Sequence, residues 1–547
     1  ENIWWNYYPQ LAQYIARSSY LLRQGDYVAD IALYSPLASQ WTKNVLNMRK
    51  WTREFDWGEL GGLIKSNGYS YDLVNDDALQ NLTTSANGKI QIGKMEYKIL
   101  ILPNVESLPV KTLQVIEQFV DRGGVVIALE RLPEYSTGLK DSPQSDEAVR
   151  KLVDQLFRKP KPLTDKAADL YGLREPKLSD GIIENHYGRG RTFQINKVMD
   201  RQIWWDKRSS TLDPFLEVLR TYVVPDFGID FAYEGLRKNE GLTFTHRKVG
   251  NRDFYFVCNI QDKTSAIPVT FRTKNKTIRK WNPYTGEITE LLKFSEAKNG
   301  IKVPLTLSPY ESMFLEFLPE EPQVYVAKTD FKEVKTETGR TLLAFAEQNG
   351  VFNSTLQIGG QQKNIQTVVD RLPAPLHVSG SWEMHLPLNS KQTFKIKTDT
   401  LFSWTDLPAI RHFSGTGSYK ISFELPAAYL SPDVKLLLDL GKIGNVAEVV
   451  LNGKKTGIVW MRDQKLDISA AVRPGVNNLE VKVTNTLINR VSSMTKAPEI
   501  PSPLIARFGT KDKSEGTPRE FGFKPLPASG LMGPVQIIPE KVVKLKF

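Results

Sequence analysis

The spacing of apolar residues changes near residue 225 and divides the chain into an earlier part with helical stretches and a later part of short strands. In the earlier part, nearly continuous apolar runs alternate with segments in which apolar residues recur every three or four positions. The apolar runs are VADIALYSP (28–36), YKILILPNV (97–105) and VVIALE (125–130). Such runs are typical of parallel strands buried on both faces. Their alternation with helices predicts a doubly wound α/β domain over residues 28–225.

From residue 226 onward, short strand patterns follow one another with turn residues at close intervals. GLTFTHRKVGNRDFYFVCNI indicates two strands around a turn, and IPVTF, WNPYTGEITEL and SMFLEFLP come after it. This pattern predicts a small β-sandwich over residues 226–325. The segment PEEPQVYVAKTD favours a boundary near residue 320, and residues 326–547 are again rich in strand patterns.

The chain opens with a helical pattern. Residues 3–24 carry apolar side chains at helical spacing, and Gly25 follows as a stop signal. This spacing predicts an amphipathic helix within a first segment of residues 1–27.

Composition and charge exclude several classes of protein. The net charge of +11 is spread over 547 residues, and no basic run is interleaved with aromatic residues as a nucleic-acid groove would require. No stretch approaches the ~20 apolar residues that a membrane-spanning helix needs. Cys258 is the single cysteine, which excludes disulfides within the chain and CxxC metal sites.

The most specific local pattern lies between residues 404 and 490. Asn452-Gly453 between two strands predicts a tight hairpin, because both positions favour positive φ. The segment resembles the galactose-binding-like jelly roll of family 2 and related glycoside hydrolases, where an SGT strand leads through a DLG, AEV and NG hairpin to a G-x-N-x-L strand. The matching residues are Ser414, Gly415, Thr416, Tyr419, Asp439, Gly441, Ala447, Glu448, Asn452, Gly453, Gly475, Asn477, Leu479 and Asn485. The resemblance implies a galactose-binding-like jelly roll within residues 326–547.

A second resemblance covers nearly the whole chain. The opening WWNYYPQLAQYIARSSYLLRQGDYVADIALYSP looks like the exit from a catalytic barrel into an amidotransferase-like α/β domain. With the distal motifs WTDLP, FSGTGSYK, NTLINR and SGLMGPV, the chain resembles the C-terminal part of the family 106 α-L-rhamnosidases. The resemblance implies that residues 1–27 end a barrel lying upstream of Glu1, and that residues 28–225 form the amidotransferase-like domain.

The same resemblance implies an activity. It implies inverting hydrolysis of rhamnosides in plant or algal polysaccharide, with the enzyme periplasmic or extracellular. An inverting enzyme holds two carboxyl groups roughly 6.5–9.5 Å apart. The resemblance places the two glutamates, and a calcium ion near the sugar, on the barrel. No stretch of this chain matches those glutamates, so we expect the catalytic pair to lie outside it, and we identify no cofactor within it.

Acidic and aromatic residues supply the remaining site candidates. Glu54, Asp56 and Glu59 in REFDWGEL are the candidate carboxylates, and the alternative is a solvated helix start. Trp4 and Trp5 are candidates for the mouth of the barrel's active site, with packing at a domain junction as the alternative. Trp460 is the candidate sugar contact of the jelly roll, with a place in the core as the alternative.

The sequence lacks the residue patterns that amidotransferase activity, dinucleotide binding and metal binding need. An amidotransferase needs a cysteine on a strand-to-helix turn, and the turns after ILILPN and VVIALE carry none. The motif GRGRTFQI (188–195) lacks the third glycine of a dinucleotide site and predicts a hairpin turn. The five histidines, at 186, 246, 377, 385 and 412, show no metal-ligand spacing.

Three functions therefore stay open, and all of them have a carbohydrate as partner. The first is part of an α-L-rhamnosidase. The second is a non-catalytic carbohydrate-binding or scaffold protein. The third is the accessory part of a barrel enzyme of the β-galactosidase or β-glucuronidase type.

Overall fold

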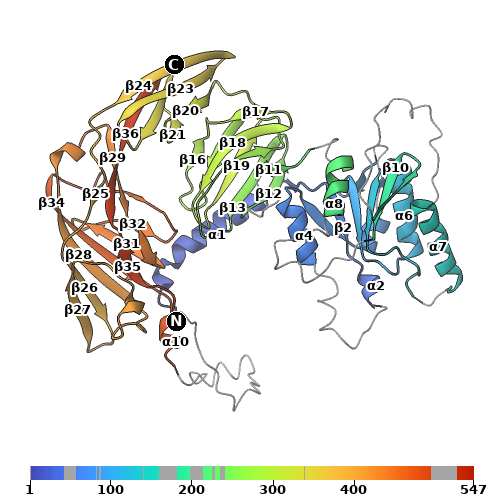
Figure 1. Ribbon diagram of the computed structural model, residues 1–547, viewed down its shortest axis with the longest axis horizontal. Coiled ribbons are helices and arrows are strands. Elements are labelled where there is room, and N and C mark those ends of the chain that lie inside the picture. Colours follow the sequence, from blue (N-terminus) through green and yellow to red (C-terminus); the bar gives the residue numbers. More distant parts are fainter. Residues whose placement is uncertain are drawn as a thin grey trace.

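The chain folds into an α/β part, a β-sandwich and a C-terminal region of strands, which follow one another along the molecule (Figure 1). The structure is a computed structural model. It describes residues 2–41, 57–81, 83–84, 88–138, 141–158, 181–196, 213–223, 228–234, 241–337, 339–494 and 526–547.

The α/β part is built on a six-stranded sheet in the order β3-β2-β7-β8-β10-β9. Its strands are β2 (Ile31–Tyr34), β3 (Tyr71–Val74), β7 (Ile99–Pro103), β8 (Val125–Leu129), β9 (Ile182–Tyr187) and β10 (Gly190–Ile195). Neighbours from β3 to β10 run parallel, and only β9 runs antiparallel, to β10. Gly188, with a φ of +59°, lies in the turn between β9 and β10, so the hairpin predicted for residues 188–195 is confirmed.

Helices cover both faces of this sheet. Ile31 and Leu33 of β2 share a core with α4 and α8, whereas Ala32 and Tyr34 share the other core with α6 and α7. Alternate residues of a strand point to opposite faces, so a strand covered on both sides is apolar throughout. The helices are α2 (Leu37–Trp41), α4 (Trp57–Ser66), α5 (Asp76–Gln80), α6 (Val110–Asp121), α7 (Gln144–Phe157) and α8 (Asp213–Val218), which continues into the π-helical η3 (Leu219–Val223). A small sheet holds β4 (Thr83–Thr84), β5 (Ile90–Ile92) and β6 (Met95–Tyr97).

Two antiparallel sheets form the sandwich. The larger contains β1 (Asp26–Tyr27), β12 (Leu242–Val249), β13 (Arg252–Asn259), β15 (Thr277–Trp281), β16 (Ile288–Glu290) and β19 (Ser312–Leu318). The smaller contains β11 (Phe231–Tyr233), β14 (Ser265–Phe271), β17 (Ser295–Ala297) and β18 (Gly300–Leu307). Cys258 lies in β13 and is half-buried, and burial raises the pKa of its thiol to about 12.

The first helix packs on the outside of the sandwich. After the 3-10 turn η1 (Trp5–Tyr7), α1 (Tyr8–Leu22) places Leu21 against Phe254 and Phe314 of the larger sheet. The predicted amphipathic helix is therefore confirmed, and its buried side faces the sandwich. Every residue of β19 is buried, because one face of the strand meets the sandwich core and the other face meets this second layer.

The C-terminal region contains two six-stranded sheets around one core. The first holds β21 (Glu333–Thr336), β22 (Thr341–Ala346), β29 (Val434–Asp439), β33 (Leu466–Asp467) and β36 (Gln536–Lys546), with β25 (Leu376–His377) paired to β36. The second holds β26 (Trp382–Pro387), β27 (Thr393–Thr398), β28 (Thr416–Leu425), β31 (Val446–Leu451), β32 (Lys454–Val459) and β34 (Gly475–Thr484). Short elements complete it: η5 (Trp404–Asp406), η6 (Ala427–Tyr429), β30 (Lys442–Gly444), α10 (Ile488–Val491) and β35 (Gly530–Gly533).

A three-stranded sheet covers the far end of this region. It holds β20 (Val324–Thr329), β23 (Gly350–Ile358) and β24 (Gln361–Val369). Its inner face shares a core with β22 and with the end of β36, near the C-terminus in Figure 1. β24 is the outer edge of the sheet.

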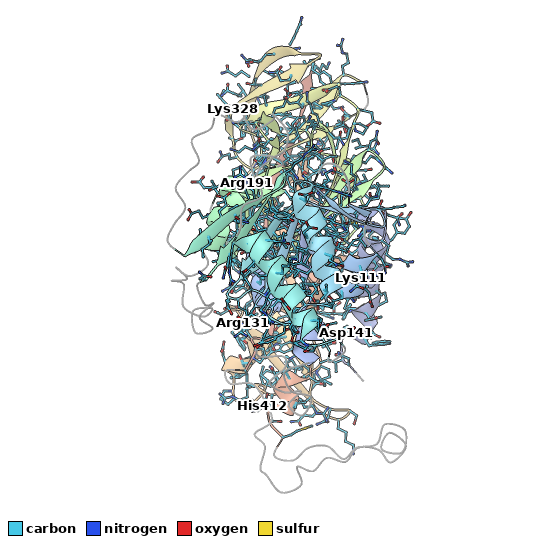
Figure 2. The ribbon with its side chains drawn as sticks, turned by 90° about the vertical axis from the view of Figure 1, so that its right-hand side faces the viewer. Lys111, Arg131, Asp141, Arg191, Lys328 and His412 are labelled. Atoms are coloured by element: carbon cyan, nitrogen blue, oxygen red, sulfur yellow. The ribbon has the colours of Figure 1, made fainter. Side chains whose placement is uncertain are left out.

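The predicted order of a mixed α/β part followed by a β-sandwich and further strands is confirmed. No helix in the described ranges is long and apolar enough to cross a bilayer. Basic side chains are distributed along the molecule, since Lys111 and Arg191 lie on the α/β part and Lys328 on the three-stranded sheet (Figure 2).

Candidate functional site

The candidate carboxylates fall on α4 and on the segment before it. Glu59 lies in α4, whereas Glu54 and Asp56 lie outside the described residues. Leu60 and Ile64 of the same helix pack into the core of the α/β sheet.

Trp4 and Trp5 lie at the start of α1. The Trp5 ring stacks on Tyr8 at 4.8 Å with an interplanar angle of 10°, and the Trp4 ring lies 6.3 Å from the same tyrosine. Trp5 is 61% exposed, so this aromatic group faces solvent in the described structure. Flat exposed rings of this kind suit either a sugar face or a protein surface.

Trp460 lies where α1, the sandwich and the C-terminal region meet. Its ring contacts Tyr14 of α1 at 6.2 Å and Tyr284 of the sandwich at 5.6 Å, both edge-on. Tyr14 and Tyr284 stack on each other at 4.8 Å, and both hydroxyls lie within 3.0 Å of the Ser312 hydroxyl. Burial raises the pKa of Tyr284 to about 12. This aromatic cluster therefore ties three parts of the chain together.

A group of buried charges lies where the α/β part meets the sandwich. We call it the joint cluster, and it consists of Asp30, Asp230, His246, Asp253 and Arg272. The two imidazole nitrogens of His246 lie 2.9 Å from Asp230 and 3.2 Å from Asp253. The Arg272 guanidinium lies 2.6 Å from Asp30 and 3.5 Å from Asp230. Arg272 thus links a carboxylate of the α/β part to a carboxylate of the sandwich.

Hydroxyl groups complete the joint cluster. Tyr255 donates a 2.8 Å hydrogen bond to Asp230, and its ring stacks on His246 at 3.9 Å. Thr273 donates a 2.6 Å hydrogen bond to Asp253. The alternation of β12 explains how a histidine comes to be inside, because Phe244 and His246 are two residues apart and share the buried face.

The electrostatics of the joint cluster favour the charged forms. Burial opposes the imidazolium of His246, but the Asp230 and Asp253 carboxylates outweigh burial and raise its pKa. Burial likewise opposes ionisation of Asp230, but His246 and Arg272 outweigh it and lower the pKa of that carboxyl. Both shifts favour the ion pair between His246 and Asp230.

A histidine between carboxylates is the arrangement of a general base, but this one is closed to a substrate. The side chains of His246 and Asp230 are 4% and 0% exposed. Catalytic acids and bases must come within hydrogen-bond reach of the reacting atoms. The joint cluster therefore has a structural role, because it holds two parts of the chain together.

The sequence did not single out the joint cluster. Its members come from residues 30 to 272, and only folding brings them together. One signal was present, since the strand pattern LTFTHRKV places a titratable residue on an apolar face.

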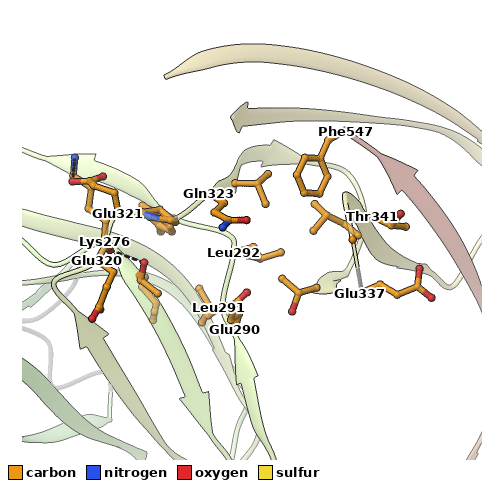
Figure 3. Close-up of a pocket in the computed structure, with 18 residues that line it drawn as sticks. Lys276, Glu290, Leu291, Leu292, Glu320, Glu321, Gln323, Glu337, Thr341 and Phe547 are labelled. Carbon is orange, nitrogen blue, oxygen red and sulfur yellow. Dashed lines mark hydrogen bonds and ion pairs between the residues drawn. The ribbon is translucent and has the colours of Figure 1, made fainter. Parts of the chain in front are cut away.

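A cavity lies between the sandwich and the C-terminal region (Figure 3). Its volume is about 380 Å³, and its lining includes the apolar residues Leu292 and Phe547. Its lining also includes four glutamates, namely Glu290, Glu320, Glu321 and Glu337. Glu321 lies 3.4 Å from Lys276, and Glu337 lies 3.0 Å from Lys544, so two of these carboxylates already have a cation. The cavity offers polar contacts to a small ligand.

Among the described ranges, no group of three or more histidine, cysteine, aspartate or glutamate side chains has the geometry to hold a metal ion.

Comparison with known families gives one match over more than half of the chain. A family model for the α-L-rhamnosidases, glycoside hydrolase family 106, matches residues 1–296. The matched region contains α1, the α/β part and most of the sandwich.

Two longer proteins are similar over almost the whole chain. A protein of Formosa agariphila named "Putative beta-glucuronidase" is 23% identical, and the match covers 98% of this chain and 57% of that protein. A rhamnosidase structure from Novosphingobium sp. PP1Y is 22% identical with a TM-score of 0.61, and the match covers 99% of this chain and 42% of that one. This chain thus spans about half the length of these relatives, and it shares the fold of the corresponding part of the rhamnosidase.

Proposed function

Because this chain belongs to glycoside hydrolase family 106, the α-L-rhamnosidase family, we propose that it is the accessory part of an α-L-rhamnosidase. The enzyme removes rhamnosyl side chains from plant or algal polysaccharide by inverting hydrolysis. The family match over residues 1–296 is the observation that carries this proposal.

In this proposal the catalytic pair, and any calcium ion near the sugar, lie on a separate catalytic barrel, which we call the catalytic body. The buried carboxylates of the joint cluster are held by cations and are closed to solvent. A hydrolase needs one carboxyl group to protonate the leaving oxygen and another to activate water, both beside an open sugar site. Glu54, Asp56 and Glu59 stay the candidate carboxylates within this chain.

The exposed face of α1 supports docking of such a body. Tyr8 and Ile15 lie seven residues apart on one side of the helix, and they are 37% and 47% exposed. Trp5 extends this side by its stack on Tyr8. An aromatic helix face of this kind is typical of a contact surface. We propose that residues 1–27 form the boundary of the catalytic body, with Trp4 and Trp5 near the mouth of its site.

We further assign names to two regions. Residues 28–225 are proposed as the amidotransferase-like domain, and the C-terminal core as a galactose-binding-like jelly roll. The left-handed φ angles of Asn452 and Gly453, +51° and +80°, support the hairpin on which the second assignment rests. Trp460 packs at the aromatic cluster, which favours a structural role for it over a sugar contact.

The proposed substrate lies outside the cytoplasm. Plant and algal polysaccharides are too large to enter a cell intact, so an enzyme that trims them works in the periplasm or outside the cell.

A second candidate is a β-glucuronidase. It is favoured by one observation, the name "Putative beta-glucuronidase" that the Formosa agariphila relative carries. Both candidates share an accessory architecture, and they differ in the sugar that the catalytic body accepts.

A substrate panel separates these candidates. The product of the complete reading frame that contains this chain is assayed on aryl α-L-rhamnoside, aryl β-glucuronide and aryl β-galactoside. We expect turnover of the rhamnoside alone. Turnover confined to the glucuronide or the galactoside would refute the rhamnosidase assignment, and binding of carbohydrate without turnover would favour a scaffold role.

A further inference from the structure

The longest edge strand of the described sheets, β24, has an unpaired outer side. β24 comprises nine residues, Gln361–Val369, and pairs only with β23 on its inner side. Within the described ranges, no backbone hydrogen bond reaches its outer side. An open strand edge presents a row of N–H and C=O groups that can pair with another strand.

The hairpin geometry identifies the outward backbone groups. Gly359 and Gly360 form the two-residue turn between β23 and β24, and both have positive φ. In such a hairpin the closing pair, Ile358 and Gln361, is hydrogen-bonded, and pairs alternate from there. The residues whose N–H and C=O groups point outward are therefore Gln362, Asn364, Gln366 and Val368.

The edge carries less of the usual protection against pairing than the other edges, since Lys363 is its one charged residue. Natural edge strands carry proline, a bulge or central lysines. The other exposed edges of six residues in the C-terminal region follow this rule, because β27 contains Lys395 and Lys397, and β32 contains Lys454 and Lys455. β24 has no proline, its register with β23 is unbroken, and all four outward residues are uncharged.

The edge is also complementary to itself. In an antiparallel pair centred on Ile365, Asn364 lies opposite Gln366 of the second copy, and Gln362 lies opposite Val368. All four outward residues then pair. The one charge of the strand, Lys363, lies opposite Thr367 of the second copy, so the two lysines stay apart.

Side-chain burial agrees with this centre. Ile365 packs against the core beneath the sheet and is only half-buried. Pairing would place Ile365 of each copy against the other and cover the rest of both. Val368, which is 68% exposed, would pack beside the second copy as well.

We propose that β24 is a dimerisation edge that pairs antiparallel with β24 of a second copy of this chain, with the two-fold axis at Ile365. The two three-stranded sheets then form one continuous six-stranded sheet. A contact of two edge strands is small, and interfaces below about 1,200 Å² are typical of weak, reversible association. The dimer therefore depends on concentration.

Cysteine cross-linking tests the register. In a non-hydrogen-bonded antiparallel pair the Cα atoms lie about 4.5 Å apart, which is within disulfide reach. Ile365→Cys should therefore form a disulfide-linked dimer under mild oxidation. The matched control is Thr367→Cys, whose two copies would lie roughly 13 Å apart. The native Cys258, half-buried with a raised thiol pKa, is present in both variants.

A second pair of variants tests the backbone contact in solution by sedimentation. Asn364→Pro removes an outward N–H, whereas Asn364→Ser retains it. Because the dimer has two-fold symmetry, the proline substitution removes two hydrogen bonds, one from each copy. The dissociation constant should therefore rise about tenfold to a hundredfold for the proline variant. The serine variant should dimerise like the parent chain. The proposal is overturned by a parent chain that stays monomeric at all concentrations, by a dimer insensitive to Asn364→Pro, or by cross-linking through Thr367→Cys instead of Ile365→Cys.

Discussion

Arg272 should contribute more to stability than an exposed arginine of the same sandwich. Its guanidinium contacts Asp30 of the α/β part at 2.6 Å and Asp230 at 3.5 Å, and its side chain is 18% exposed. Arg272→Met keeps an unbranched apolar side chain in place of the aliphatic part of the arginine and removes the charge. Both carboxylates then lose a cation in a buried setting.

The expected loss of stability depends on which cations remain beside the two carboxylates. Removing one partner of a buried ion pair costs about 3–5 kcal/mol. Lys98 still lies 3.5 Å from Asp30, and His246 still lies 2.9 Å from Asp230, so the lower end of that range applies. We expect Arg272→Met to lower the free energy of unfolding by about 3 kcal/mol.

Urea unfolding followed by tryptophan fluorescence measures this loss. The control is Arg279→Met, since the Arg279 side chain is 44% exposed and lies 3.9 Å from the buried Glu316, which keeps its 2.8 Å contact with Arg252. We expect this variant to lose at most about 1 kcal/mol. A double-mutant cycle of Arg272→Met with Asp30→Asn should give a coupling of at least about 1 kcal/mol. Equal losses for the two arginine variants, or zero coupling, would refute the view that the joint cluster holds the two parts together.

Three further predictions concern the rest of the chain. The lowered pKa of Asp230 adds stability that is fully present above the unfolded pKa of about 3.9 and is lost as the pH falls through the folded pKa. The raised pKa of His246 adds stability that is fully present below the unfolded pKa of about 6.5 and is lost as the pH rises through the folded pKa. Thermal midpoints should therefore be highest from about pH 4 to 6.5, and His246→Gln should flatten the alkaline decline; an unchanged alkaline decline would contradict this. Gly530→Ala should lower the free energy of unfolding in urea by about 3 kcal/mol, because its Cβ would lie 2.5 Å from a core indole nitrogen at a φ of +94°. The control Gly453→Ala, in open space at a φ of +80°, should lower it by about 1 kcal/mol. Equal losses would contradict the packing argument. Trp460→Ala should lower the free energy of unfolding by about 2 kcal/mol, roughly half the loss that the same substitution causes at a fully buried site. Unchanged stability together with weaker binding of rhamnose-containing oligosaccharides would instead favour a sugar contact.

The α/β part could be predicted from the sequence because its strands are buried on both faces. A run such as Ile99–Pro103 is apolar without interruption, and Gly123 and Gly124 end the helix before the next strand. These signals are local, so they survive without knowledge of the partners. The hairpin at Asn452-Gly453 was predictable for the same reason.

The joint cluster could not be predicted, because the ion pair that joins the α/β part to the sandwich is long-range. Asp30 and Arg272 are separated by most of the α/β part, and nothing near either residue specifies the other. The side of α1 that meets the sandwich was equally hidden. Periodicity shows that Leu21 is buried, but not that Phe254 and Phe314 bury it.

The central claim is that this chain serves a rhamnosidase without carrying its catalytic pair. The most direct measurement compares the turnover of an aryl α-L-rhamnoside by the purified 547-residue chain and by the product of the complete reading frame that contains it. We predict hydrolysis by the longer product and none by the chain alone. Turnover by the chain alone, retained through purification, would contradict the account.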